Sequence, residues 1–354
     1  VHREEVYIMV EGLAPMTSPP ATLTVATAQT VLRPSGKLHV DANPLQGSER
    51  VKFELEMARA NDPSLGRLRT LHSIADGVPE ILRKANPVNT ATMTRMLADP
   101  PTAPPVAGST PEATKPGQRT QIDLWKGPCT SIHGNTYLQV HYDAYSTHFE
   151  LESLKYKSQA PQAADEYFNE VKGRGVKVSG GVLWRDNEIV LNSAAMHAVE
   201  KTHEVRGRNS NEYGPTGNSG AESVFRILPH EMRKSMIRAG TPDEFWEDAA
   251  FDGARILAAT RERNGVAVGT IFDGRRRTLK GRRVWGCLVV AKKPPTWVAS
   301  KTDDRGVAGI NLGRSRTKPG WNVWSPDFGV FTSTHVTFFE TVFPFKDGTF
   351  ELHG

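Results

Sequence analysis

Three acidic residues of this chain are placed where they could bind metal ions and transfer phosphoryl groups. Asp123 opens the phrase Asp-Leu-Trp-Lys-Gly-Pro, Asp186 ends Gly-Gly-Val-Leu-Trp-Arg-Asp, and Glu222 ends Pro-Thr-Gly-Asn-Ser-Gly-Ala-Glu. Between the last two lie 35 residues, 187–221. Two Mg²⁺ ions about 3.5–4 Å apart can activate the attacking oxygen and neutralise the charge that develops in phosphoryl transfer. Because Mg²⁺ prefers oxygen ligands, the pattern predicts a two-metal polynucleotidyl transferase that uses Mg²⁺ or Mn²⁺.

The spacing by itself is weak support, because the 354 residues include 39 acidic ones and acidic pairs at any separation are common. A single Asp or Glu is most often a solvated surface residue. Three carboxylates packed together would also repel and raise each other's pKa. We therefore expect the site to be weakly ordered until a metal ion relieves this repulsion.

The elements that must position these carboxylates follow from local patterning. Alternating apolar residues predict strands, and apolar residues at helical spacing predict helices. The predicted strands are 120–125, 136–142, 148–154 and 176–184, and the predicted helices are 159–172, 190–201, 219–239 and 242–263. Thr241 is expected to cap the last helix, with Pro242 at its first position. This order places Asp123 on the first strand, Asp186 just after the fourth, and Glu222 near the start of a helix, in an α/β fold.

The regions on either side have a different character. Residues 97–118 include six prolines between Pro100 and Pro116 and predict an extended linker. Residues 62–85 could hold one or two short helices, whereas residues 1–60 are weakly patterned, with short strands expected at 5–10 and 21–32. Short apolar strands separated by turns at 284–291, 306–312, 321–324 and 330–339 predict a small β-barrel or β-sandwich module.

These phrases, in order over residues 115–342, resemble a copia-type LTR-retrotransposon integrase. The matching phrases also include Asp143-Ala144-Tyr145-Ser146, Leu154-Lys155-Tyr156-Lys157-Ser158, Phe245-Trp246 with Ala249, Trp285-Gly286-Cys287 and Gly320-Trp321-Asn322-Val323-Trp324-Ser325-Pro326. The resemblance implies a ribonuclease H-like integrase core with a mixed five-stranded sheet flanked by helices at 119–270, and a small all-β barrel-like domain at 284–342. The remaining divisions are a poorly ordered region at 1–49, a degenerate zinc-finger-like region at 50–96 and the linker at 97–118.

The resemblance also implies the activity: metal-dependent DNA strand transfer that inserts retroelement DNA ends into target DNA. Asp123, Asp186 and Glu222 would be the catalytic and metal-binding residues for two ions. The partners implied are double-stranded DNA and, when the protein is active, further copies of itself. We expect the protein to enter the nucleus after synthesis in the cytoplasm and to be a piece of a longer polyprotein or a damaged copy of one.

Three departures from the family pattern bear on activity. After Asp186-Asn187 the family usually has Gly-Gly-Glu-Phe, and Glu188 takes the place of the first glycine. Glu188 adds a negative charge there and could not adopt a turn that needs a positive φ. Ser223 replaces an arginine. Pro229 lies seven residues after Glu222, where it should remove one helical hydrogen bond and kink the helix. A catalytically inactive remnant that only binds nucleic acid is therefore the alternative to an active enzyme.

Zinc binding is not expected. The family's two zinc-binding histidines would fall near Glu56 and Asn61, and its two cysteines near Asn86 and Asn89. A structural zinc site needs four good ligands. Cys129 and Cys287 are far apart and form no Cys-x-x-Cys motif, so a disulfide framework is also unsupported.

Several further residues could contact DNA. Asn218 precedes Glu222 by four residues and either orients DNA near the metals, as the resemblance implies, or caps a helix. Net charge is +5 and the pI about 9.1, which favours a polyanionic partner. The densest basic cluster could bind DNA phosphates or be a solvated turn; it consists of Arg275, Arg276, Arg277, Lys280, Arg282 and Arg283. His197, His203 and His230 are expected at the surface.

Two other classes of protein remain open. The chain could be a protein-interaction module that acts through its C-terminal β region, which predicts little affinity for DNA. It could also be a plain nuclease of the same fold, although a C-terminal β module argues against that. No apolar run approaches the roughly 18–20 residues of a membrane span, so a membrane partner is not expected.

Overall fold

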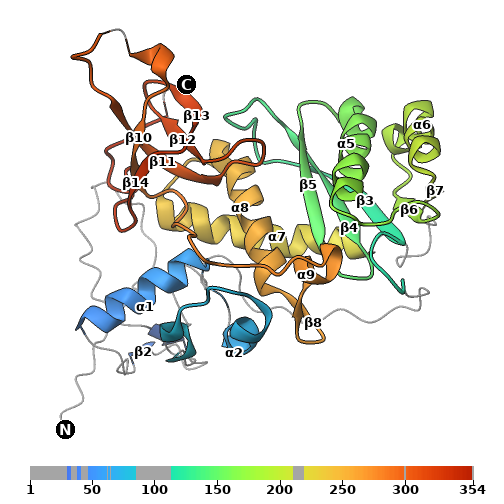
Figure 1. The fold of residues 1–354 in the computed structure, drawn as a ribbon, viewed down its shortest axis with the longest axis horizontal. Helices are drawn as coiled ribbons and strands as arrows, with labels where there is room; N and C mark the ends of the chain where they lie inside the picture. Colours follow the sequence, from blue (N-terminus) through green and yellow to red (C-terminus); the bar gives the residue numbers. More distant parts are fainter. Residues whose placement is uncertain are drawn as a thin grey trace, which may run out of the picture.

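A computed structural model describes residues 30–32, 38–40, 47–61, 63, 65–84, 113–209, 219–298 and 300–352. Asn218 and the strand predicted at 5–10 lie outside these residues, as do most of the 97–118 linker and of the 21–32 strand pair. Figure 1 shows the α/β part towards the right, the β-rich C-terminal part at the upper left, and the N-terminal helices α1 and α2 below.

The central part is a mixed five-stranded sheet in the order β5-β4-β3-β6-β7. Its strands are β3 (Arg119–Lys126), β4 (Tyr137–Asp143), β5 (Phe149–Leu154), β6 (Val182–Arg185) and β7 (Arg206–Asn209). The first three pair antiparallel, whereas β3–β6 and β6–β7 pair parallel. Three antiparallel strands followed by parallel strands with intervening helices are the topology of the ribonuclease H-like integrase core, so the predicted fold class is confirmed.

Helices cover both faces of this sheet (Figure 1). They are η2 (Lys157–Gln159), α5 (Ala160–Gly173), η3 (Ile189–Asn192), α6 (Ala194–His203), α7 (Ser219–Ala239), η4 (Asp243–Phe245), α8 (Trp246–Thr260) and α9 (Val268–Asp273), with a small hairpin of β8 (Glu262–Arg263) and β9 (Val266–Ala267). One apolar cluster joins Ile122 and Leu183 of the sheet to Phe168 of α5 and Met196 of α6. A second lies on the opposite face, under α7 and α8.

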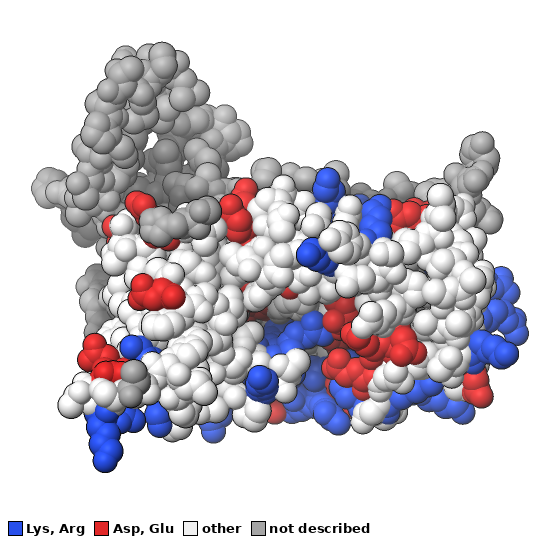
Figure 2. Space-filling model, turned by 90° about the horizontal axis from the view of Figure 1, so that it is seen from above, with Lys and Arg blue, Asp and Glu red and all other residues white. Residues whose placement is uncertain are grey.

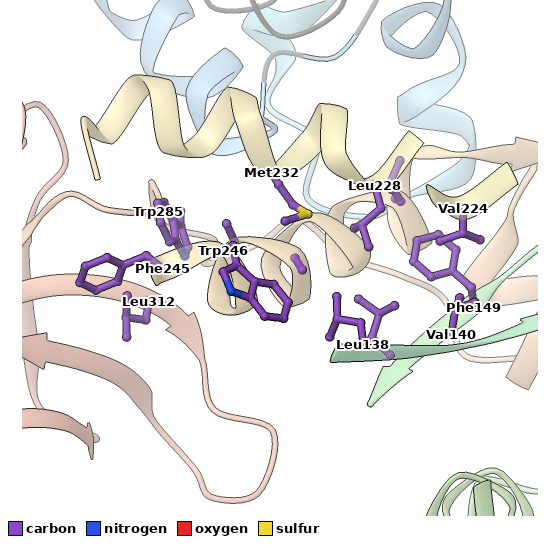
Figure 3. Close-up of a cluster of buried hydrophobic side chains, with 14 of the residues drawn as sticks. Leu138, Val140, Phe149, Val224, Leu228, Met232, Phe245, Trp246, Trp285 and Leu312 are labelled. Atoms are coloured by element: carbon purple, nitrogen blue, oxygen red, sulfur yellow. The ribbon is translucent and has the colours of Figure 1, made fainter. Parts of the chain in front are cut away.

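The second cluster continues beyond the core. Figure 3 shows Leu138 and Val140 of β4, Leu228 of α7, Trp246 of α8 and Leu312 of the C-terminal sheet in the same cluster. Because buried apolar side chains are contiguous from the core sheet to the C-terminal sheet, the two parts pack directly against each other and share one hydrophobic cluster.

The C-terminal part is a five-stranded antiparallel sheet in the order β13-β12-β11-β10-β14. Its elements are β10 (Leu288–Lys292), η5 (Pro295–Trp297), β11 (Gly306–Arg314), β12 (Trp321–Ser325), β13 (Gly329–Ser333) and β14 (Val336–Phe339). The predicted segment 330–339 is two strands rather than one. Cys287 is fully buried immediately before β10.

The described N-terminal residues form a pair of short strands and then helices. These elements are β1 (Thr30–Leu32) paired with β2 (Leu38–Val40), then α1 (Gly47–Arg59), α2 (Leu65–Ile74) and the short η1 (Glu80–Lys84). The helices predicted in 62–85 are confirmed, but α1 was not predicted. Its apolar residues Val51, Phe53, Leu55 and Met57 alternate like a strand, and only Phe53 and Met57, four apart on one helical face, are fully buried.

The predicted cap of the last core helix is wrong. Pro242 rather than Thr241 is the N-cap of the short η4 turn, and α8 begins only at Trp246. The hydroxyl of Thr241 is buried with no hydrogen-bond partner among the described residues. In the described part of the chain, no helix is both long enough and apolar enough to cross a bilayer.

Candidate active site

Strand β3 fixes the face on which Asp123 lies. Side chains alternate across a strand, and Ile122 and Leu124 pack on the α5–α6 face. Asp123 therefore points to the α7 face, where it pairs across the sheet with the buried Val140. Its half-buried carboxylate accepts a 2.8 Å hydrogen bond from the backbone N–H of Leu124.

The parallel pairing of β3 and β6 brings Asp186 next to Asp123. Ile122 is in register with Arg185, the last residue of β6, and the residue that follows each of them is one of the two aspartates. The buried Arg185 is ion-paired with Glu200 of α6, which ties this end of β6 to its helix. Asp186 itself is exposed, and its carboxylate accepts a 2.7 Å hydrogen bond from the N–H of Asn187.

Helix α7 brings Glu222 towards the same edge of the sheet. The N–H of Ala221 donates a 3.1 Å hydrogen bond to Oε1 of Gln121, two residues before Asp123. This approach needs a glycine at position 220, because a Cβ there would lie 2.2 Å from the Tyr142 ring and 2.3 Å from Gln121 Oε1. The first turn of α7, with the exposed Glu222 on it, is thus held against β3 and β4.

The charges at this edge act on one another. Burial raises the pKa of Asp123 to about 6, the hydrogen bond from Leu124 opposes the rise, and the negative charges of Asp186, Glu222 and Glu188 add to it. The predicted residues are thus electrostatic neighbours, together with a fourth carboxylate. Within the described residues, however, no three carboxylate, histidine or cysteine side chains are already arranged to hold a metal ion.

Glu188 has a partner that the sequence did not reveal. Its carboxylate is ion-paired with Lys157, and the side chains are 32% and 45% exposed. This pairing raises the pKa of Lys157, and the nearby Asp123 contributes to the rise. The expected backbone problem at Glu188 is absent, because its φ is −61° and its ψ is 134°, which any residue adopts. Lys157 stands in one of the phrases that carry the resemblance, and that phrase was the only available signal.

The other two departures are accommodated. The hydroxyl of Ser223 donates a 2.6 Å hydrogen bond to the carbonyl of Gly220, within the first turn of α7. Pro229 lies inside α7, which continues as one helix from Ser219 to Ala239. The helix that carries Glu222 therefore keeps its packing on the sheet despite the missing N–H of Pro229.

Most of the predicted basic cluster is engaged inside the protein. Arg277 pairs with Asp273 at 2.9 Å, Arg282 binds both carboxylate oxygens of Asp252 at 2.7 Å, and Arg283 pairs with Glu340 at 2.9 Å. Arg276 pairs with Asp76, whereas Arg275 and Lys280 are exposed. These pairs join the segment to the core, the N-terminal helices and the C-terminal sheet, and a role in DNA binding stays a prediction.

The surface position predicted for His203 is wrong. This residue is 1% exposed, packs near the ring of Phe168 and contacts Asp165 through Nε2 at 2.7 Å. His197 is more than half exposed, as expected, and its Nδ1 lies 3.1 Å from Glu200. None of these contacts involves the carboxylate edge.

Comparison with known proteins agrees with this architecture. Residues 287–351 match the retroviral polymerase SH3-like domain. The chain is 24% identical over 252 residues to the retrovirus-related Pol polyprotein from transposon RE2 of Arabidopsis thaliana, and 24% identical over 249 residues to that from transposon RE1. The matches include 70% and 69% of this chain but only 17% and 16% of the two polyproteins.

Solved integrase structures are similar at low identity. The catalytic core domain of BIV integrase is 16% identical, with 44% of this chain and 93% of that chain covered and a TM-score of 0.35. The HTLV-2 integrase catalytic core domain in complex with magnesium is 13% identical, with 46% and 99% covered and a TM-score of 0.35.

The chain thus combines a ribonuclease H-like core with a C-terminal part that matches the retroviral polymerase SH3-like domain, and it is similar to retrovirus-related Pol polyproteins. The particular resemblance read from the sequence, to a retrotransposon integrase, is confirmed.

Proposed function

We propose that the chain performs metal-dependent DNA strand transfer with Asp123, Asp186 and Glu222 as its catalytic residues. The observation that carries the proposal is the electrostatic coupling of Asp123 to Asp186 and Glu222, at an edge built by β3, β6 and α7. The resemblance to retrotransposon polyproteins supports the reaction class. The whole polyproteins are much longer than the matched region, so this activity is a proposal for the chain itself.

The residues fit Mg²⁺ or Mn²⁺ by donor chemistry. All the candidate ligands are carboxylate oxygens, which hard divalent cations prefer, and their mutual repulsion is a cost that bound cations would relieve. Bound metal ions would supply Lewis-acid activation of the attacking hydroxyl and of the phosphodiester. Asp123, half-buried on the sheet, would fix the position of the ions, while the exposed Asp186 and Glu222 would complete their coordination. Lys157 would keep the additional charge of Glu188 paired.

Double-stranded DNA would be the substrate, and joining two DNA ends at one target would require more than one copy of the chain. Among the solved integrase structures are an intasome of simian T-cell lymphotropic virus and a trimeric form of the HTLV-2 catalytic core domain. These assemblies are properties of those proteins, and oligomerisation of this chain is part of the proposal.

The test is strand transfer in vitro with a short duplex that carries a free 3′-hydroxyl, in the presence of Mg²⁺ or Mn²⁺. We expect joined products from the wild-type chain and none from Asp186→Asn, which keeps the size of the side chain but removes its charge. EDTA should abolish the products. Products that persist in Asp186→Asn would contradict the assignment of this residue.

A second candidate function is nucleic-acid binding without catalysis. The observation that favours it is the absence, among the described residues, of three carboxylates already grouped around a metal position. Salt-sensitive DNA binding by the wild-type chain, with no joined product in either metal, would support this candidate. The Mn²⁺ affinities of the wild-type chain and of Asp123→Asn also distinguish the two candidate functions. If the carboxylates bind metal, Asp123→Asn should lower the Mn²⁺ affinity; if they do not, the two affinities should be equal.

A further inference from the structure

A second charged surface lies away from the carboxylates, in a groove of 860 Å³. Its walls come from β5, α5, α8, the segment 276–283 and the loop between β11 and β12. Figure 2 shows a hollow near the middle of the displayed face, with basic side chains inside it and acidic side chains along one side. Since β4 lies between β3 and the groove-lining strand β5, the groove is distinct from the edge that carries Asp123.

Three of the arginines in the groove pair with carboxylates that also line it, whereas Arg276, Arg277 and Arg283 pair with carboxylates outside the lining. Arg174 pairs with Glu150 at 2.9 Å, Arg316 with Glu152 at 2.6 Å, and Arg282 with Asp252 at 2.7 Å. These pairs neutralise the acidic residues in the interior of the groove. Glu166 and Glu170 lie on its outer rim, where both are exposed and Glu170 is 4.0 Å from Arg174.

Three other cations have no ion pair in the described part of the chain. The guanidinium of Arg255 donates a hydrogen bond to the carbonyl of Arg314, and the guanidinium of Arg314 lies over the Trp321 ring, 4.6 Å from its centroid. Lys280 is exposed at the same groove. Burial lowers the pKa of Arg255, the nearby negative charge of Asp252 opposes this, and the positive charges of Arg282, Arg316 and Arg314 lower the pKa further. These three cations therefore add positive charge to the groove without an ion pair of their own among the described residues.

We propose that this groove binds the phosphate backbone of a nucleic acid through Arg255, Lys280 and Arg314. Guanidinium groups bind phosphate oxygens in a fixed geometry, and a groove with uncompensated charge of one sign concentrates ions of the other. The carboxylates of Glu166 and Glu170 would repel phosphates and direct the strand to the basic wall. The inference rests on the proposed function, and it adds a second nucleic-acid contact remote from the triad.

The first test measures the salt dependence of duplex DNA binding. A fluorescein-labelled duplex would be titrated with the wild-type chain and with Lys280→Gln/Arg314→Gln at several salt concentrations, with anisotropy as the readout. Each lost phosphate contact should reduce the slope of log Kd against log salt concentration by about 0.9, so the variant should lose about two units. Lys52→Gln/Lys201→Gln removes the same charge from exposed residues of α1 and α6 and should keep the slope.

The second test looks for a gain, which misfolding cannot imitate. Glu166→Gln/Glu170→Gln removes the repulsive rim and should tighten DNA binding by about twofold to fivefold per charge, the range for exposed charge interactions. Glu262→Gln/Glu351→Gln is the matched control at two exposed residues away from the groove lining. Unchanged affinity in the rim variant, together with an unchanged slope in the basic variant, would overturn the groove proposal.

The probes also distinguish this proposal from its alternatives. If polyglutamate binds the groove with the same sensitivity to Lys280→Gln/Arg314→Gln while duplex DNA does not bind, the partner is an acidic protein and the inference is wrong. If the wild-type chain performs strand transfer but the salt slope of DNA binding is unchanged in Lys280→Gln/Arg314→Gln, the groove proposal is wrong and the proposed function is retained. If DNA binding depends on the groove residues but no strand transfer occurs, the groove proposal is retained and the proposed function is wrong.

Discussion

Lys157 and Glu188 form an ion pair beside Asp123, although 30 residues separate them along the chain. Glu188 would otherwise place a fourth negative charge next to the three carboxylates. The lysine supplies a compensating charge without occupying the positions of Asp186 or Glu222. The positive charge of Lys157 therefore offsets the negative charge that Glu188 adds relative to the family sequence.

Removing Lys157 should weaken the site through Glu188. We expect Lys157→Ala to reduce both Mn²⁺-dependent strand transfer and DNA affinity, because Glu188 then repels the incoming phosphate. Glu188→Gly, which restores the glycine of the family phrase, should preserve or improve both. The double variant should recover most of the loss seen in Lys157→Ala. Additive effects in this double-mutant cycle, measured by product yield and by anisotropy, would show that the two residues act independently.

The contribution of Asp123 to the stability of the metal-free protein should fall as pH rises from about 4 to about 6. The pKa of Asp123 is about 6 in the folded protein against 3.8 as its ordinary value, so the folded state binds more protons in this window and is favoured at its lower end. The full shift corresponds to about 3 kcal/mol, and solvent screening reduces it. Urea unfolding of the wild-type chain and Asp123→Asn in EDTA measures the difference.

The variant is the control for the many other titrating groups. Asp123→Asn should show a flatter pH dependence between pH 4 and 6 than the wild-type chain. Added Mg²⁺ should stabilise the wild-type chain more at pH 7 than at pH 5, because protons compete with the metal for the carboxylate. Parallel curves for the two proteins would mean that Asp123 titrates normally.

Gly220→Ala should impair the site more than the fold. The added methyl would lie 2.2 Å from the Tyr142 ring and 2.3 Å from Gln121 Oε1, so the first turn of α7 must move away from β3. Strand transfer should fall by at least tenfold, while the thermal transition remains cooperative. Gly173→Ala, at the last residue of α5, is the matched control, since a Cβ there meets nothing within 4 Å and the change should not lower stability. Full activity in Gly220→Ala would show that the first turn tolerates displacement.

The N-terminal helices should depend on a buried polar cluster. Glu231 of α7 is 1% exposed and pairs with Lys234 at 2.7 Å and with Arg67 of α2 at 2.9 Å. The side-chain amide of Asn61 donates to Glu231 Oε2 at 2.9 Å, and Lys234 Nζ donates to the carbonyl of Asn61 at 2.7 Å. Nearby charges hold the pKa of Glu231 below its ordinary value against the effect of burial.

Glu231→Ala should therefore destabilise the protein by about 3–5 kcal/mol, the usual cost of leaving a buried charge unpaired. Protease cleavage between α1 and α2 should become faster if the N-terminal helices detach. Glu351→Ala, at an exposed residue, should change the free energy of unfolding by less than about 0.5 kcal/mol. An equally small effect of Glu231→Ala in guanidinium unfolding would show that the cluster is not required for docking.

The sequence by itself determined the parts of this protein that depend on local order. Alternation in 120–125 places Asp123 on one face of a strand, and helical spacing in 219–239 predicts α7 with the bounds that it has. The order of strands and helices, together with the phrases around the three carboxylates, was enough to predict the fold class and the resemblance. Helix α1 was not predicted, because its apolar residues alternate as they would in a strand.

Only the tertiary structure decided which charges meet. The pairing of Lys157 with Glu188, the burial of His203, and the engagement of Arg282 and Arg283 with Asp252 and Glu340 all join distant segments. A charged side chain has the same local pattern whether it faces water or a partner, because the partner's position is set by how helices and sheets pack. For the same physical reason, the unbalanced cations of the groove appear only once the core and the C-terminal sheet lie together.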